Sequence, residues 1–202
     1  MKGSSRKGRE RQAAILAIAE DLFGGYGYQA TSLQSIADRA GISQTGLIHH
    51  FPTKEQLFGA VIDARQREDK HAFERLLVEH RGDALEVILA MVRALVARPT
   101  RARFYVAVVA RGLVSADPAP QQFIDWTRRS CGYLAGQLAA RQAEGWLSAD
   151  VDVGVVSRQI HAVMYGLTLQ WRLDPGRVDI LSITTAYLEQ LRAQIDAPPP
   201  RV

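Results

Sequence analysis

Residues 31–55 constrain the fold of this chain more than any other stretch, because their apolar spacing predicts two short helices joined by a tight turn. Gly41 follows the last apolar residue of the first helix, where a left-handed backbone ends a helix at little cost. Leu47 and Phe51 lie four residues apart and would anchor the second helix inward, and Pro52 would end it. The segment therefore predicts a helix-turn-helix, whose second helix enters the major groove of DNA.

Polar residues predict how these helices begin. Thr31 and Gln34 have the spacing of a reciprocal capping box at the first helix. Thr53 and Gln56 repeat that spacing at a later, longer helix. Lys54 then falls in the first turn of the longer helix, where the helix dipole disfavours a cation. We expect a phosphate group to be the partner of Lys54.

The segment from Thr31 to Leu57 reads T-S-L-x-x-I-A-x-x-A-G-I-S-x-x-G-L-x-x-H-F-P-x-K-E-x-L. This pattern resembles the signature of the TetR/AcrR family of transcriptional regulators. The resemblance implies a homodimer that binds palindromic operator DNA through its first three helices and releases it when a small molecule enters the C-terminal domain. Position 48 departs from the family, where tyrosine is common and donates to the DNA backbone. Ile48 offers only apolar contact, for example to a thymine methyl group, and we expect His49 to take over the backbone contact.

The helix-turn-helix then supplies the predicted DNA contacts. Gln44 can pair with adenine or guanine edges, Thr45 can touch a thymine methyl group, and Gly46 permits close backbone approach. The remaining residues would hold phosphates or cap the helices, and for each of them an exposed helix residue or a cap is the alternative. The DNA-binding set is Thr31, Ser32, Gln34, Ser43, Gln44, Thr45, Gly46, Ile48, His49, His50 and Lys54.

Charge and cysteine content agree with an intracellular DNA-binding protein. The formal net charge is +4, and residues 1–11 hold five basic residues against one acidic residue, so the excess lies at the N-terminus. Such an arm can neutralise phosphates, and a solvated tail is the alternative. The single cysteine, Cys131, excludes an internal disulfide framework, and no leader segment is visible, so we expect a cytoplasmic protein.

Helical periodicity continues through the rest of the 202 residues, and no strand pattern or repeat appears. We predict an all-α fold of about nine helices, with an N-terminal three-helix DNA-binding domain and a C-terminal helical domain for ligand binding and dimerisation. The first helix should run from Arg9 to Phe23 and end at Gly24, Gly25 and Gly27. The later helices should cover 53–80, 83–98, 100–114, 118–144, 152–174 and 179–195. The predicted domains are a basic flexible arm at 1–8, the DNA-binding domain at 9–55 with its motif at about 32–51, the helical domain at 56–197 and a tail at 198–202.

The last two helices carry more apolar surface than one chain needs to bury. Polar residues interrupt the segment after Asp152 too often for a membrane span. A second copy of the chain could cover this surface, as the family resemblance implies, and filling of the monomer's own core is the alternative. The predicted dimer-interface residues are Gly166, Leu169, Ile183, Tyr187 and Leu191.

A small-molecule effector is expected among the fifth to eighth helices, where apolar walls and a few polar groups make a plausible pocket. Arg111 and His161 could meet an anionic or carbonyl group, and ordinary packing is the alternative for each residue. The effector's identity does not follow from the sequence. The candidate lining residues are Phe104, Val108, Arg111, Trp126, Cys131, His161 and Tyr165.

The predicted function is therefore a ligand-responsive, sequence-specific transcriptional regulator, acting as a repressor that its effector releases from DNA. The alternatives are an activator or architectural DNA-binding protein without ligand control, and an enzyme. Enzymatic motifs such as G-x-S-x-G, H-E-x-x-H and the Walker loop do not occur, and no Cys/His metal cluster is visible, so we expect no catalytic residue, metal or cofactor.

Overall fold

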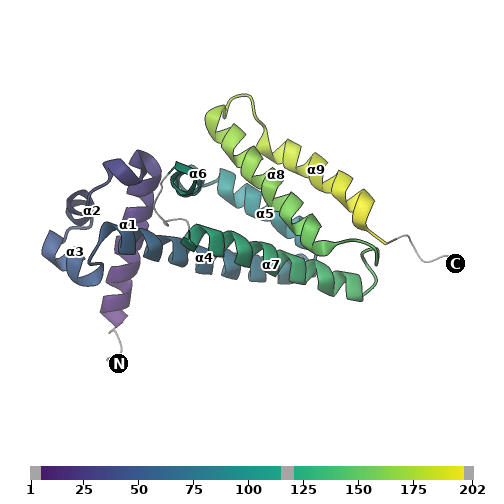
Figure 1. Ribbon diagram of the computed structural model, residues 1–202, viewed down its shortest axis with the longest axis horizontal. Helices are drawn as coiled ribbons and strands as arrows, with labels where there is room; N and C mark the ends of the chain where they lie inside the picture. The colour runs from purple at the N-terminus through teal and green to yellow at the C-terminus, as the bar shows by residue number, and fades with distance from the viewer. Residues whose placement is uncertain (1–5, 115–120, 198–202) are drawn as a thin grey trace. The chain divides into compact units, whose positions relative to one another are not determined.

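The computed structural model describes residues 6–114 and 121–197, and the side chains at 8–109, 121 and 124–197. Within these residues the chain forms nine helices and one isolated β-bridge, between Leu147 and Asp196, which confirms the all-α prediction (Figure 1). The helices are α1 (Arg6–Ala30), α2 (Leu33–Arg39), α3 (Gln44–His50), α4 (Lys54–Glu79), α5 (Ala84–Val96), α6 (Pro99–Val114), α7 (Gln121–Ala143), α8 (Val153–Leu173) and α9 (Ile180–Ile195).

The chain divides into two compact units. Unit 1 contains α1, α2, α3, the part of α4 up to Asp69, and α6. Unit 2 contains the rest of α4 from Lys70, then α5, α7 from Ile124, α8 and α9. The unit that holds the helix-turn-helix is thus larger than the predicted DNA-binding domain at 9–55, because α6 packs into the same core. The functional boundary near residue 55 stays a prediction.

Unit 1 has its own apolar core, to which all five of its helices contribute. The Phe58 ring lies edge-on to the rings of Phe23, at 5.1 Å between centroids, and Phe104, at 5.8 Å. These contacts join α4 to both α1 and α6. The main buried residues of this core are Ile15, Phe23, Ile36, Leu47, Phe51, Leu57, Phe58, Val61, Phe104 and Val108.

The glycines of α1 behave differently from the prediction. The helix does not end at Gly24 and Gly25 but continues to Ala30, with a kink at Gly27, where φ is 81°. Gly24 lies where α6 approaches α1 closely, since a Cβ atom added there would stand 2.9 Å from the Phe104 backbone nitrogen. The glycine at position 24 therefore serves close helix packing, and only Gly27 uses the conformational freedom that was expected to end the helix.

The cap of α2 also differs from the predicted Thr31–Gln34 box. Ser32 is the N-cap, and its hydroxyl accepts from the Ser35 backbone N–H while the Ser35 hydroxyl accepts from the Ser32 N–H. The turn after α2 is as predicted, with Gly41 at φ 65°. Thr53 caps α4 as predicted, because its hydroxyl accepts from the Gln56 N–H at 3.1 Å.

In unit 2, α8 and α9 lie antiparallel to one another (Figure 1). Asp83, Asp152 and Asp179 cap α5, α8 and α9 through their carboxylates. The proline at 99 begins α6, whereas it was expected to end the preceding helix, because proline fits the first helical position, where no N–H partner is needed.

The inward face of α9 corrects the predicted interface. Leu191 is only 5% exposed and belongs to the protomer's own core, with Leu188 and Ile195. The helix turns this face toward α5 and α8, Tyr187 packs partly against the same core, and Ile183 is exposed. Leu191 is therefore not available to a second chain.

Candidate nucleic-acid interface

One face of α3 packs into the core of unit 1, and the opposite face is exposed to solvent. Leu47 and Phe51 are buried, as their spacing predicted, and anchor α3 in the core of unit 1. The Ser43 hydroxyl accepts from the Gly46 backbone N–H at 3.0 Å and so caps the helix. An anchored helix of seven residues loses little conformational freedom when it docks, which suits it to enter a groove.

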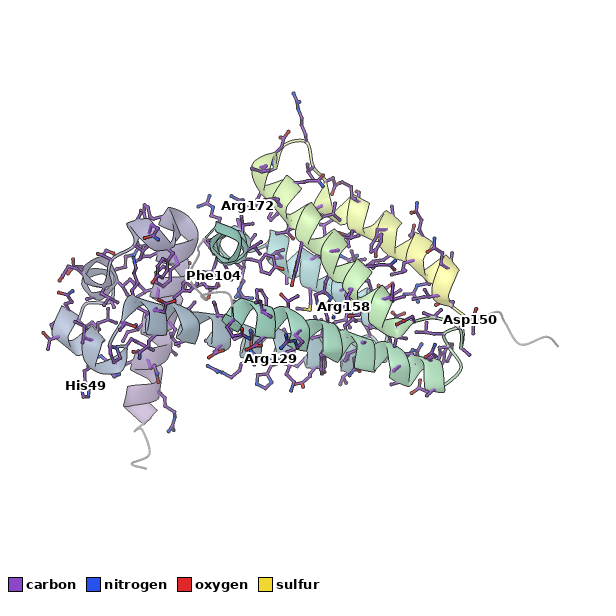
Figure 2. All side chains as sticks on the ribbon, in the orientation of Figure 1. His49, Phe104, Arg129, Asp150, Arg158 and Arg172 are labelled. Carbon is purple, nitrogen blue, oxygen red and sulfur yellow. The ribbon has the colours of Figure 1, made fainter. Side chains whose placement is uncertain are left out.

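The exposed side chains of α3 form what we call the outward surface, defined as Gln44, Thr45, Ile48 and His49. Figure 2 shows His49 at the outer edge of unit 1. His50 is half-buried, and its ring centroid lies 6.0 Å from that of His49. The predicted base-contacting residues therefore share one solvent-facing surface.

On α2, two of the predicted contact residues are exposed. Ser32 is the N-cap, so its side-chain oxygen is already engaged with Ser35. Gln34 donates from Nε2 to the Asp38 carboxylate at 2.6 Å. A hydrogen bond from Gln34 to a phosphate would compete with the one to Asp38. The negative charge of Asp38 would also repel the phosphate.

Thr31 is not placed to contact DNA through its side chain. It is 3% exposed, and its hydroxyl donates toward the backbone carbonyls of Gly27, at 2.8 Å, and Leu22, at 3.1 Å. Of these two carbonyls, that of Gly27 lies at the kink of α1. Thr31 thus holds the end of α1 in place instead of capping α2.

Lys54 has an explanation other than a phosphate. Its ammonium group donates to the carbonyls of Tyr28 and Thr31, both at 3.0 Å, and of Gln29 at 3.4 Å. The same ammonium lies 4.4 Å from the centroid of the Tyr28 ring. Carbonyls at the C-terminal end of a helix attract cations. The end of α1 therefore stabilises the Lys54 ammonium electrostatically, whereas the N-terminal end of α4 does not. These carbonyls account for the position of Lys54 without a phosphate, and a contact from Lys54 to DNA stays a prediction.

A cluster of charged residues around the buried Arg65, which the sequence analysis did not predict, joins three helices of unit 1. Arg65 on α4 is 8% exposed and pairs with Glu68 at 2.9 Å, with Asp69, and with Glu20 of α1 at 4.0 Å. Arg101 of α6 reaches Glu68 at 3.2 Å. The spacing of Arg65 and Asp69 on one helix was a signal that could have been followed.

Burial and the paired charges both shift the pKa values of this cluster. Desolvation raises the pKa of Glu20 despite the nearby Arg65 guanidinium. Burial also opposes the charge of Arg65, but the hydrogen bond with Asp69 and the surrounding carboxylates outweigh it and raise the pKa of Arg65. The guanidinium stays charged and links α4 to Glu20 of α1.

Sequence comparison agrees with the geometry of the helix-turn-helix. The profile of bacterial regulatory proteins of the tetR family matches residues 15–61, which span most of α1, all of α2 and α3 and the start of α4. Residues 15–61 of this chain are therefore similar to the tetR family of bacterial regulatory proteins.

Curated relatives match a similarly short part of this chain. RutR of Escherichia coli K12, an HTH-type transcriptional regulator, is 43% identical over 58 residues, which are 29% of this chain and 27% of RutR. The HTH-type transcriptional activator FasR of Mycolicibacterium smegmatis is 38% identical over 65 residues, 30% of each chain. This chain therefore matches less than a third of the length of these relatives.

Solved structures extend the likeness to the whole fold. The complex of SmeT with triclosan has a TM-score of 0.80 at 19% identity and covers 96% of this chain and 95% of SmeT. SmeT is described as the repressor of the Stenotrophomonas maltophilia multidrug efflux pump SmeDEF. At this level of identity the comparison shows a shared fold.

The candidate effector residues separate into two groups. Phe104 and Val108 lie in the core of unit 1, where Phe104 packs against α1 and α4 (Figure 2), which contradicts the prediction that they line a pocket with the others. The Arg111 side chain lies outside the described residues. Trp126 is half-buried in unit 2.

The remaining effector candidates lie together on α7 and α8 of unit 2. His161 places Nδ1 2.8 Å from the Ser157 carbonyl, and burial lowers its pKa. Burial raises the pKa of Tyr165 to about 12, and its hydroxyl lies 3.4 Å from that of Thr127. The Ser157 hydroxyl donates to the Cys131 carbonyl at 2.7 Å, and burial raises the pKa of the Cys131 thiol.

The dimer candidates on α8 and α9 are mostly accessible. Leu169 and Ile183 are exposed, while Gly166 and Tyr187 are half-buried. Leu173, which was not predicted, is 77% exposed at the end of α8.

None of the described helices is long and apolar enough to cross a membrane. In the described part of the chain, no three His, Cys, Asp or Glu side chains gather where they could hold a metal ion.

Proposed function

We propose that this chain is a sequence-specific transcriptional regulator that binds operator DNA as a homodimer and responds to a small-molecule effector. The observation that carries the proposal is the outward surface of α3. It combines an amide, a hydroxyl and an aliphatic side chain on a helix that is anchored by Leu47 and Phe51. A rigid helix with such side chains is suited to direct readout in the major groove.

The test of DNA binding uses the full chain and an operator selected from a random duplex library. Fluorescence anisotropy at about 150 mM salt should give roughly a thousandfold preference for the selected duplex over a shuffled one. A Gln44→Ala variant should reduce that preference, because it removes a base-reading amide without touching the core. The matched control is Gln142→Ala in unit 2, whose side chain bonds the Ser148 and Val151 carbonyls. Equal binding of wild type to both duplexes would refute sequence-specific regulation.

Dimerisation is proposed through the accessible apolar residues of α8 and α9. Two recognition helices must reach half-sites about 34–36 Å apart or wider, which requires a second copy of the chain. Leu169, Leu173 and Ile183 offer exposed aliphatic surface on these helices. Leu173→Glu with Ile183→Glu should give a monomer in light scattering. Val78→Glu is the control, since Val78 is 81% exposed on α4 of the same unit, and an equal effect of that change would count against the α8–α9 interface.

An effector site is proposed at the cluster of Thr127, Cys131, His161 and Tyr165. These side chains combine an imidazole and a phenol with partial burial, so they could orient a ligand through hydrogen bonds. SmeT has been solved with triclosan, which shows that a protein of this fold can hold a small molecule. A thermal-shift screen should find compounds that stabilise wild type but not a Tyr165→Phe variant. A screen in which every stabilising compound acts equally on both proteins would reject this cluster as the site.

The sign of regulation is proposed to be repression, with the effector releasing the protein from DNA. SmeT is described as a repressor, whereas FasR is named an activator, so both signs occur among similar proteins. Transcription in vitro from a promoter that contains the selected operator decides between them. Repression that an effector relieves supports the proposal, and stimulation by the bound protein supports the activator alternative. We propose a cytoplasmic location because the DNA partner lies there.

A further inference from the structure

The outward surface of α3 lacks the side chains that most often read guanine. Residues 44–50 are Gln-Thr-Gly-Leu-Ile-His-His, with no lysine or arginine. The guanine edge presents two acceptors in the major groove, which a guanidinium or ammonium group meets best, whereas an amide pairs bidentately with adenine. The composition of this surface therefore favours A·T over G·C base pairs.

Ile48 is the apolar member of this surface. It is 40% exposed, although its neighbour Leu47 is fully buried, so its side chain is not part of the core. A single exposed isoleucine needs no explanation by itself. The position of Ile48 indicates a role in DNA binding, because it shares the outward surface of α3 with the side chains that are proposed to read bases. An aliphatic group there can gain only van der Waals contact, and the thymine C5-methyl is the apolar group that the major groove presents.

The spacing of Gln44 and Ile48 adds a geometric constraint. The two residues are four apart, so they lie on the same flank of α3, about 6 Å from one another along the helix axis. Base pairs in DNA stack at about 3.4 Å, so this separation corresponds to roughly two base-pair steps. Thr45 and His49 occupy the adjoining flank and do not come between them.

We propose that Ile48 contacts the C5-methyl group of a thymine about two base-pair steps from an adenine that Gln44 reads, so that α3 selects an A·T-containing half-site. The inference rests on the proposed DNA-binding function and deepens it by naming the bases. The contact is made to a base and not to the DNA backbone, so Ile48 determines specificity as well as affinity.

Deoxyuridine substitution tests the contact at the level of one methyl group. Each thymine of the selected operator is replaced in turn, symmetrically in both half-sites, by deoxyuridine, which pairs like thymine but lacks the methyl. For wild type, one position should weaken binding about 4-fold for each methyl and on the order of 15-fold for both half-sites. The same duplex should bind the Ile48→Ser variant as well as the unsubstituted operator does. Ile48→Val, which keeps a branched aliphatic side chain, is the matched control and should remain sensitive.

The outcomes separate this inference from the function on which it rests. If no deoxyuridine position distinguishes wild type from Ile48→Ser, the contact is overturned, while preference for the selected duplex still upholds sequence-specific binding. If the sensitive thymine stays sensitive in Ile48→Ser, another residue reads it and the assignment is also overturned. If selection yields no preferred duplex, both proposals fall. Ile48→Ala provides a second loss variant should the serine variant unfold, and matching circular dichroism spectra verify folding.

Discussion

Replacing Gly24 with alanine tests the close approach of α1 and α6. An alanine Cβ would stand 2.9 Å from the Phe104 nitrogen, 3.1 Å from its Cα and 3.2 Å from its Cβ. Two of these three atoms are backbone, so no side-chain rotation can relieve the contact. The helices would have to move apart within a core that Phe23, Phe58 and Phe104 fill.

Gly25 provides a matched control, because it occupies the next position of the same helix and a Cβ there would have no neighbour within 4 Å. Alanine in a helix is favoured over glycine by about 1 kcal/mol, so Gly25→Ala should raise the free energy of unfolding by up to that amount. Gly24→Ala gains the same propensity but also meets the overpacking cost of about 1–3 kcal/mol. The difference between the two variants isolates the clash, and we expect Gly24→Ala to be the less stable by about 1–3 kcal/mol.

Urea unfolding at one fixed protein concentration measures both values, and the fixed concentration removes the effect of dimerisation on apparent stability. A Gly24→Ala variant as stable as Gly25→Ala would refute the close approach of α1 to α6. An equal loss of stability in both variants would show that α1 does not tolerate alanine near its kink. The loss in Gly24→Ala could then not be assigned to the contact with α6.

Three further predictions concern hydrogen bonding and protonation. Lys54→Met keeps the aliphatic stem but removes the ammonium from three carbonyls, so it should lower the free energy of unfolding by about 1.5–3 kcal/mol, whereas Lys70→Met, at an exposed pair with Glu74, should change it by less than about 1 kcal/mol. Equal effects in urea unfolding would contradict the capping role. Thr31→Val should cost about 1–3 kcal/mol because two buried carbonyls lose a donor, and Thr31→Ser should restore most of this in the same assay. Burial lowers the pKa of His161, so its contribution to stability is present above the ordinary imidazole value and is lost as pH falls through the lowered pKa. The free energy of unfolding of wild type should therefore fall more steeply below about pH 6.5 than that of His161→Gln, and parallel profiles would contradict the prediction.

Local signals along the chain were sufficient for the approximate positions of the helices and for the residues of the outward surface. Leu47 and Phe51 were assigned to the inward side of α3 from their spacing alone, and the structure buries both. The left-handed Gly41 and the Ser43 cap followed from local chemistry as well. These features depend on neighbours within one or two helical turns, which the sequence displays directly.

Residues whose partners lie far along the chain were decided by tertiary structure. Lys54 donates hydrogen bonds to carbonyls more than twenty positions away. The backbone of Phe104, on another helix, leaves no room for a side chain at Gly24. Leu191 was assigned to an interface because periodicity shows that a face is apolar but not which neighbour covers it. The sequence by itself thus determined the all-α class, the helix-turn-helix and the residues on its outward surface, because these follow from local periodicity and capping. The packing partners of α1, the buried charges around Arg65 and the inward face of α9 were decided only when distant helices came together and excluded water from between them.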